Sequence, residues 1–337
     1  MSEKSGPSAI KAFSQRVIAR ALQLRLVRSY LRYSEHRGPA LADSITYRAL
    51  FSVFAAVFLG FSIAALWLGG NPDAMRALVD ALESVVPGIT EAVDLSEIRP
   101  MGFTIGAVVS LIGLAGAAIG SIGSLRLALR TLADELHDDD NFVWVLLRNL
   151  LVAIAFGGLL LAAAVLSVAT SVGVQTAAAW LGVPLDSGPA SMLTRGLGVL
   201  VVFAIDTLAI VLVFRLLSGV AAPARALWGG AMLGGAGLVV LQELSSLFVR
   251  GAASNPLLAT FSALIALLLW FNLSAQVILL ASSYIIVATA EAHDRVRERF
   301  GATTLAQYRR RRAEDRVQLA SRELRAAQEA DEAERRD

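Results

Sequence analysis

The chain has 337 residues, of which 56% are hydrophobic and 17% charged, with a formal net charge of +2 and a mean hydropathy of +0.62. Soluble domains carry about 25% charged residues, so this composition predicts a membrane protein. The chain contains no cysteine, which excludes disulfides, thiolate metal sites and cysteine nucleophiles.

Residues 1–48 predict a cytoplasmic N-terminal arm that contains a basic amphipathic helix on the membrane surface. Within Pro7–Arg37, apolar residues recur at spacings of three or four, with Lys and Arg between them. A nucleic-acid-binding arm is the alternative, but no aromatic stacking pattern accompanies the charge. The apolar positions are Ile10, Phe13, Val17, Ala21, Leu24, Val27 and Leu31, and the basic ones are Lys11, Arg16, Arg20, Arg25, Arg28 and Arg32. The first long apolar run begins near Ala49, too late for a cleaved signal peptide, so we expect an uncleaved signal-anchor.

Residues 49–290 predict an all-α, six-helix transmembrane bundle. A run of about twenty apolar residues, rising about 1.5 Å each, crosses the ~30 Å hydrocarbon core of a bilayer. The expected spans are about 49–69, 101–125, 149–171, 197–217, 226–248 and 257–289. The last is long for one crossing, so we expect it to tilt or to continue beyond the bilayer. The first loop, Asn71–Pro100, predicts a short amphipathic helix over Ala74–Val86.

The basic residues predict that both termini are cytoplasmic. Nine Lys and Arg precede the first span, and further arginines flank the second and fourth loops, whereas the other three loops carry few. We therefore expect a multi-pass membrane protein with both ends on the cytoplasmic side. Residues 291–337 form a charged cytoplasmic tail, either a solvated helix or a partly disordered segment, whose Arg309–Arg312 run is a candidate contact for anionic lipid.

Two sets of glycines predict close helix packing. The first set falls at spacings 3, 4 and 3 on one helix face, and small residues spaced by four let membrane helices approach closely. The stripes are also candidate surfaces for a homo-oligomer. A phosphate-binding loop is excluded because no lysine follows Lys11, so we expect no cofactor. The glycines are Gly113, Gly116, Gly120 and Gly123 in the second span, and Gly230 and Gly234 in the fifth.

Asp206 is the most informative polar residue, because it lies near the middle of the fourth span. A carboxylate at that depth costs about 2.5–3.5 kcal/mol on insertion scales. Two interpretations stay open. Asp206 is either a proton, cation or substrate site, or a protonated group bonded to a neighbouring helix.

Other polar residues form a candidate substrate or ion pathway that crosses the bundle. Asn272 and Gln276 share one face of the last span. Glu243 is expected to form a structural ion pair at the interface, with Arg250 two turns on and Arg195 at the same outer level, and a role as substrate ligand is the alternative. Anchoring at the head-group level accounts for Tyr47 and Arg48, whereas Asp43 is a helix cap or part of a gate. From outside to inside the predicted order is Arg195 and Glu243, Asp206, Asn272 and Gln276, and then Asp43, Tyr47 and Arg48.

No catalytic or metal site is expected. His137 precedes Asp138–Asp140, but consecutive acids in a loop cannot all face one ion. The other histidines, His36 and His293, are isolated in the sequence. No Ser/His/Asp set or pair of catalytic carboxylates is found at usable spacing.

The chain resembles the YihY/BrkB family of inner-membrane proteins, most closely its YhjD-like branch. The matching motifs are Leu41–Ser52 (LADSITYRALFS), Arg225–Ala231 (RALWGGA) and Leu267–Leu273 (LLLWFNL). Two departures concern Val53–Ala55, where many members have Leu-Phe-Pro, and Ala281–Ser283, where many have Gly-Ala-Glu. The role of that glutamate therefore does not carry over.

The resemblance implies a six-helix protein of the bacterial cytoplasmic (inner) membrane that is tied to envelope function. In some proposals such a protein exports lipid or another envelope component. Members of the family have also been labelled ribonuclease BN, an old assignment that is regarded as mistaken. We therefore expect a transporter or exporter that is not ATP-driven by itself, with membrane lipids and a small-molecule or lipid substrate as partners and no nucleic acid. A scaffolding membrane protein is the alternative, and an enzyme is the weakest hypothesis.

Overall fold

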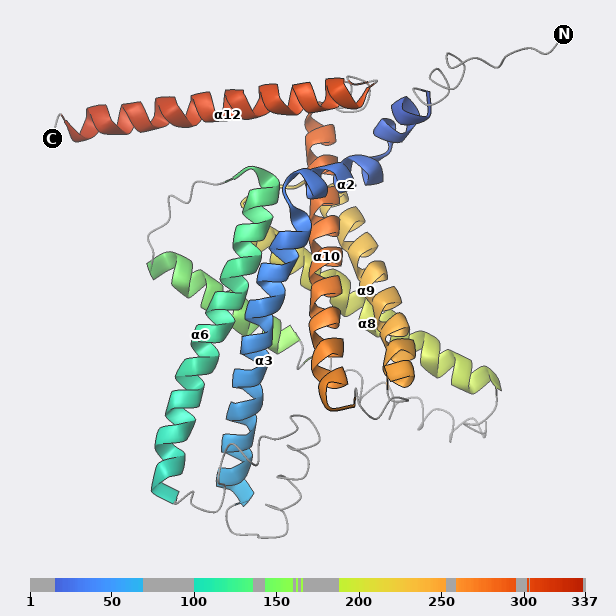
Figure 1. The fold of residues 1–337 in the computed structure, drawn as a ribbon, viewed down its shortest axis with the longest axis vertical. Helices are drawn as coiled ribbons and strands as arrows, with labels where there is room; N and C mark the ends of the chain where they lie inside the picture. Colours follow the sequence, from blue (N-terminus) through green and yellow to red (C-terminus); the bar gives the residue numbers. More distant parts are fainter. Residues whose placement is uncertain are drawn as a thin grey trace. The chain divides into compact units, whose positions relative to one another are not determined.

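The computed structural model is all-helical over the residues that it describes, namely 16–68, 100–135, 143–159, 162, 165, 188–252, 259–294, 302 and 304–335. The predicted all-α class is thereby confirmed for this part of the chain. The main helices are α2 (Arg25–Glu35), α3 (Gly38–Leu68), α6 (Pro100–Ala133), α8 (Gly188–Leu217), α9 (Ala224–Ala252), α10 (Ala259–His293) and α12 (Leu305–Glu334) (Figure 1). They fall into two compact units, one of Met1–Leu31 with Ile286–Asp337 and the other of Arg32–Ile285.

Five helices are long and apolar enough to cross a membrane. They are Gly38–Val57, Leu111–Ala133, Arg195–Leu217, Ala224–Leu244 and Leu264–His293. Only 11–39% of the residues in their most apolar stretches are buried within the protein, so most of these apolar side chains stay at least partly accessible, as side chains that contact lipid would be. At the third predicted span the structure has the shorter apolar helix Val143–Leu159. The remainder of that span and nearly all of the loop Asn71–Pro100, with its expected helix Ala74–Val86, lie outside the described residues.

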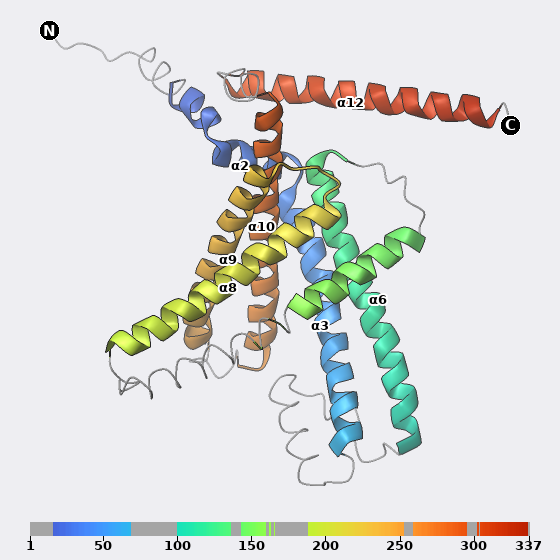
Figure 2. The ribbon, with the colours of Figure 1, turned by 180° about the vertical axis from the view of Figure 1, so that it is seen from behind.

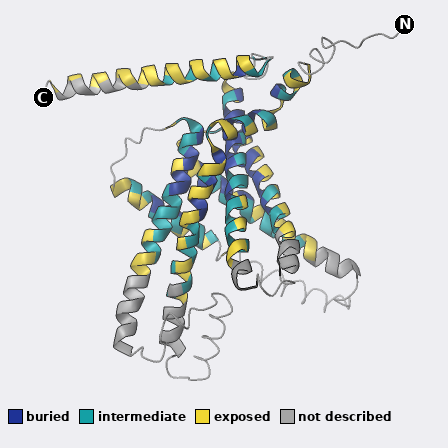
Figure 3. Cartoon of the chain, in the orientation of Figure 1, coloured by how far each residue is buried: buried dark blue, intermediate teal, exposed yellow. Residues whose placement is uncertain are grey.

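In the larger unit, α3 packs along α6 and α8 packs along α9. The Val143–Leu159 helix crosses α3 and α6, on the near side in Figure 2 and on the far side in Figure 1. Its Arg148 donates a hydrogen bond to the Leu216 carbonyl near the end of α8. Figure 3 colours the described residues by burial. The largest fully buried apolar side chains lie on α6, α8 and α10 and include Leu129, Leu132, Ile210, Phe214 and Leu279.

Glycines bring α9 close to its neighbours. A Cβ at Gly230 would lie 2.3 Å from Ile285 Cγ1, and one at Gly234 would lie 2.7 Å from the Ala281 Cβ, both on α10. A Cβ at Gly235 would lie 2.4 Å from Thr207 Oγ1 on α8. The turn before α9 needs a glycine for a different reason, since Gly219 has φ of +75°.

In the smaller unit, Glu291 near the end of α10 accepts hydrogen bonds from Arg25 and Arg28, the latter at 3.1 Å. Arg28 is only 1% exposed, and Arg32 of the larger unit only 4%. Their predicted position on the water-facing side of a surface helix is therefore wrong, because distant carboxylates pair with them. The tail, for which two interpretations were open, contains α12, where Arg310 pairs with Glu314 at 3.2 Å.

Candidate functional site

Three of the predicted pathway residues form one hydrogen-bonded chain between α3 and α10. Asn272 Nδ2 donates to Asp43 Oδ1 at 2.7 Å, and Gln276 Nε2 donates to Asn272 Oδ1 at 2.7 Å. Asn272 and Gln276 lie one helical turn apart, so they share a face of α10, and both are half-buried, whereas Asp43 is exposed. Both distances are those of good hydrogen bonds. The chain thus extends polar groups from an exposed carboxylate into a largely apolar bundle.

The predicted order placed Asn272 deeper than Asp43, and the structure shows that the two side chains are in direct contact. The order of the polar residues across a membrane stays a prediction. The 30-residue apolar part of α10 is about 45 Å long at about 1.5 Å per residue, well beyond the ~30 Å of a hydrocarbon core.

Asp206 is half-buried on α8 and bonds to a residue that the sequence argument missed. Gln242 Nε2 on α9 donates to Asp206 Oδ2 at 3.2 Å. A lone amide in the apolar run of α9, adjacent to Glu243, was the available signal. The carboxylate therefore has a neutral polar partner on a neighbouring helix, an arrangement that suits either of the two interpretations of Asp206.

Glu243 forms an ion pair with Arg195, one of its two candidate partners, with Arg195 Nη2 3.1 Å from Glu243 Oε2. It also joins α8 to α9. The two side chains are 75% and 53% exposed, so water or lipid head groups screen much of their attraction. This pair is a surface contact and is separate from the chain at Asp43.

Tyr47 and Arg48 lie apart from the Asp43 chain. Tyr47 is 63% exposed, and its ring packs edge-on against Phe51 with 4.9 Å between centroids. The guanidinium of Arg48 reaches α6 instead, where its Nη1 lies 3.3 Å from the position of a Cβ on Gly120. Of the other glycines in that stripe, Gly123 meets Asn149, whereas a Cβ at Gly113 or Gly116 would have no described atom within 4 Å.

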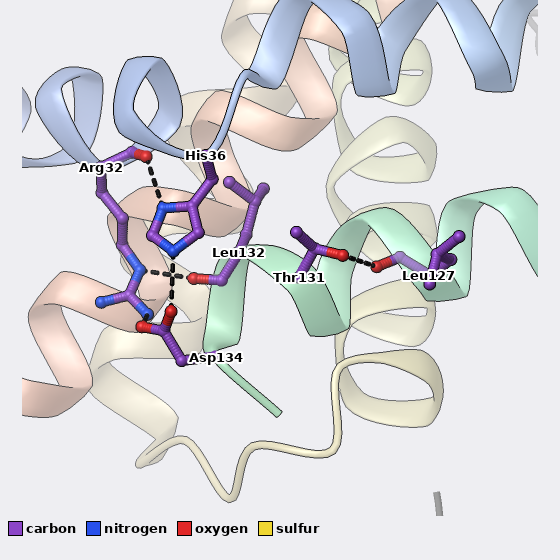
Figure 4. A network of polar contacts seen from close by, with 6 residues as sticks. All are labelled: Arg32, His36, Leu127, Thr131, Leu132 and Asp134. Atoms are coloured by element: carbon purple, nitrogen blue, oxygen red, sulfur yellow. Dashed lines mark hydrogen bonds and ion pairs between the residues drawn. The ribbon is translucent and has the colours of Figure 1, made fainter. Parts of the chain in front are cut away.

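A charged cluster at the end of α6 was not foreseen (Figure 4). Arg32 Nη2 lies 2.6 Å from Asp134 Oδ2, and Arg32 Nε donates to the Leu132 carbonyl at 2.5 Å. His36 Nε2 lies 2.7 Å from Asp134 Oδ1, and its Nδ1 donates to the Arg32 carbonyl at 2.8 Å. His36, which is isolated in the sequence, is therefore joined in space to a residue 98 positions away. The Leu132 carbonyl is one of the last four carbonyls of α6, which lack a hydrogen-bond partner within the helix. The cluster therefore caps the end of α6 and holds residues 32–36 against it.

Within the part of the chain that the structure describes, no group of three His, Asp or Glu residues is placed to hold a metal ion. The acidic run Asp138–Asp140 lies outside the described residues.

Helices of membrane-spanning length, apolar on most sides and crossed by a few polar contacts, define a polytopic α-helical membrane protein. A family profile described as "Virulence factor BrkB" matches residues 29–304, and the chain belongs to this family. The match covers the whole larger unit and the polar contacts described within it. The contacts of Arg25 and Arg28 with Glu291 and the pair of Arg310 with Glu314 involve residues outside the match. No curated protein and no solved structure matches the chain.

Proposed function

We propose that this BrkB-family membrane protein is a transporter or exporter of a lipid or another envelope-related solute. The observation that carries the proposal is the hydrogen-bonded chain of Asp43, Asn272 and Gln276 between α3 and α10. A polar solute leaving water needs replacement hydrogen bonds, and a carboxylate followed by two amides offers both donors and acceptors. Asp206 places a second polar group on α8, and carboxylates within a membrane commonly mark substrate or ion pathways.

We propose further that the chain has six spans, both termini in the cytoplasm and a place in the bacterial inner membrane, as a member of the YhjD-like branch. The clustering of Lys and Arg before the first span and beside the second and fourth loops supports this orientation. The motifs Leu41–Ser52 and Leu267–Leu273 support the branch. They also contain Asp43 and Asn272, so the residues that carry the resemblance include two of the three in the polar chain.

A scaffolding role in the envelope is the second candidate, and it is favoured by the close packing of α9. Gly230, Gly234 and Gly235 each lie where a Cβ would come within 3 Å of a neighbouring helix, which suits a rigid assembly. We do not propose an enzyme, because the polar contacts among the described residues include no nucleophile with an adjacent base.

Single cysteines in this naturally cysteine-free chain test the proposal. Asn272→Cys and Gln276→Cys are each treated in oriented vesicles with a membrane-impermeant maleimide, which needs a water-exposed thiol. A transporter that exposes this site to both sides in turn is labelled from either side. The matched control is Leu279→Cys on the same helix, where the native side chain is fully buried, and it should not react. Failure of both test positions to react from either side, in folded protein, would leave the scaffold as the better proposal.

The substitution Asp206→Asn further distinguishes a transporter from a scaffolding protein. It keeps the size of the side chain and the bond to Gln242 but removes the ionisable group. We expect lost solute flux with unchanged folding if Asp206 serves transport. A change in stability or assembly alone supports the scaffold.

A further inference from the structure

The contacts of His36 require one more proton than a neutral histidine carries (Figure 4). Its Nδ1 lies 2.8 Å from the Arg32 carbonyl oxygen, and its Nε2 lies 2.7 Å from Asp134 Oδ1. A carbonyl oxygen and an ionised carboxylate can only accept hydrogen bonds, so both ring nitrogens must donate. An imidazole with two N–H groups is the imidazolium cation. With a neutral His36, one of the two contacts would place a nitrogen lone pair against an oxygen lone pair.

Two charged groups face His36. Asp134 lies across from it at the end of α6, and Arg32 lies one turn earlier on α2, with its Nη2 2.6 Å from Asp134 Oδ2. A cation beside a carboxylate favours the ionised form, so Arg32 favours the state in which the proton is on His36 and Asp134 is ionised. His36 and Asp134 are only 16% and 24% exposed, so water screens this pair less than a surface ion pair. The neighbouring charged residues on α2 and α6 are exposed or bonded elsewhere, namely Glu35, Arg37, Arg130 and Glu135.

The backbone on both sides of the contact has an uncommon conformation. Asp134 has φ of +62°, and Arg37, next to His36, has φ of +53°; a positive φ is uncommon outside glycine. Asp134 lies just after α6, where its N–H donates to the Thr131 carbonyl, and glycine is the usual residue at such a helix end. Conformations of this kind persist when surrounding contacts fix them. The corner between α2 and α3 therefore depends on the contacts made there.

We propose that His36 and Asp134 form a proton-dependent contact that controls the α2–α3 corner, defined as His36 and Arg37 between the two helices. While His36 is charged, it holds the corner against the end of α6. When it loses the second proton, one of its two hydrogen bonds is lost and the corner opens more often. The charge of histidine ordinarily changes between pH 5 and 8, so the contact weakens as the pH rises through this range. The proposal does not rest on the proposed transport.

The test is amide hydrogen exchange of the purified full chain at about pH 5.5 and about pH 8, on the two sides of this range. Each rate is corrected for the intrinsic effect of pH on exchange. The amides of the corner are those of His36, Arg37 and Leu41, which donate to carbonyls within residues 32–37. The reference amides are those of Ala226 and Leu227, which donate to the Pro223 carbonyl at the start of α9.

Two variants fix the charge at the corner, and a third is the matched control. His36→Arg keeps a cation at both pH values, whereas His36→Gln is neutral at both. The control is His293→Gln on α10. His293 Nδ1 also bonds to a carbonyl one turn earlier, that of Thr289 at 2.9 Å, but its Nε2 has no carboxylate partner in the described part of the chain.

We expect the protection of the corner amides in the native chain to fall about fivefold from the lower to the higher pH. Protection measures the opening equilibrium, and a hydrogen bond from a charged donor is roughly twice as strong as a neutral one; fivefold corresponds to about 1 kcal/mol. His36→Arg and His36→Gln should lose this pH dependence, and His293→Gln should keep it in full. The reference amides should not change.

Two results would overturn the proposal. Equal protection of the corner amides at both pH values in the native chain would mean that no proton controls the corner. A native-like pH dependence in His36→Gln or His36→Arg would mean that another group carries the proton. The first result needs only the native chain, so it decides the matter even where a variant does not fold. None of these variants alters Asp43, Asn272 or Gln276, so failure here is distinguishable from failure of the cysteine-labelling test.

Discussion

Gly235→Ala is the sharpest structural prediction, since it adds one methyl group at the closest approach of α9 to α8. The new Cβ would lie 2.4 Å from Thr207 Oγ1 and 3.2 Å from both the Phe203 carbonyl oxygen and the Thr207 nitrogen. Thr207 is buried and β-branched, so its side chain has little freedom to turn away, and the two backbone atoms can move only if α8 moves. Overpacking of this kind costs about 1–3 kcal/mol. Alanine regains up to about 1 kcal/mol of helix propensity, which leaves a net loss of about 1–2 kcal/mol.

The assay is thermal unfolding of the purified chain in detergent, with Gly229→Ala as the matched control. Gly229 lies on the same helix, and its Cβ would have no described atom within 4 Å. We expect Gly235→Ala to lower Tm by roughly 2–8 °C, at about 2–4 °C per kcal/mol for a unit of this size. Gly229→Ala should leave Tm unchanged or raise it slightly. If the two variants shift Tm equally, the close approach of α8 and α9 at Gly235 is not what stabilises this region.

Two further substitutions contrast a buried ion pair with an exposed one in the same unfolding assay. Asp134→Asn removes the carboxylate that faces the 4%-exposed Arg32, and we expect a loss of about 2 kcal/mol, below the 3–5 kcal/mol of a fully buried pair because Asp134 is partly exposed. A loss below about 0.5 kcal/mol would contradict a stabilising role for the cluster that caps α6. Arg195→Gln should cost less than about 1 kcal/mol, because Arg195 and Glu243 are both largely exposed; a larger loss would show that lipid or protein shields this pair.

The sequence predicted the spans well because long apolar runs have few other physical explanations. Four of the five span-length helices overlap most of an expected span, and Gly38–Val57 overlaps the first only in part. Its start was missed because the polar residues Asp43–Arg48 suggested that the helix begins after them. Intrahelical bonds carry α3 through this polar stretch from Gly38, with Thr46 Oγ1 also donating to the Ala42 carbonyl at 2.8 Å.

The contacts at the sites were less predictable, because each joins residues far apart in the chain. Arg28 and Arg32 fit a basic amphipathic pattern, and that pattern does not distinguish a water-facing arginine from one that meets Glu291 or Asp134. Likewise, Asn272 and Gln276 could be assigned to one face of α10 by their spacing. Their bond to Asp43 depends on how α3 and α10 are placed along each other, which no periodicity within either helix specifies.

The positions of the described buried side chains in the larger unit bear on the transport proposal. The buried described side chains fall near the start of α3, the end of α6, the end of α8 and the start of α9. The capping cluster at Asp134 and the close glycine contacts lie in these same segments. A transporter that exposes its site to each side in turn must separate helices at one end while the other stays packed. On this proposal the described conformer is closed at the packed end. Gly235→Ala, which forces α8 and α9 apart there, should therefore shift the population toward the conformer that is open at that end, and it should increase maleimide labelling of Gln276→Cys from that side.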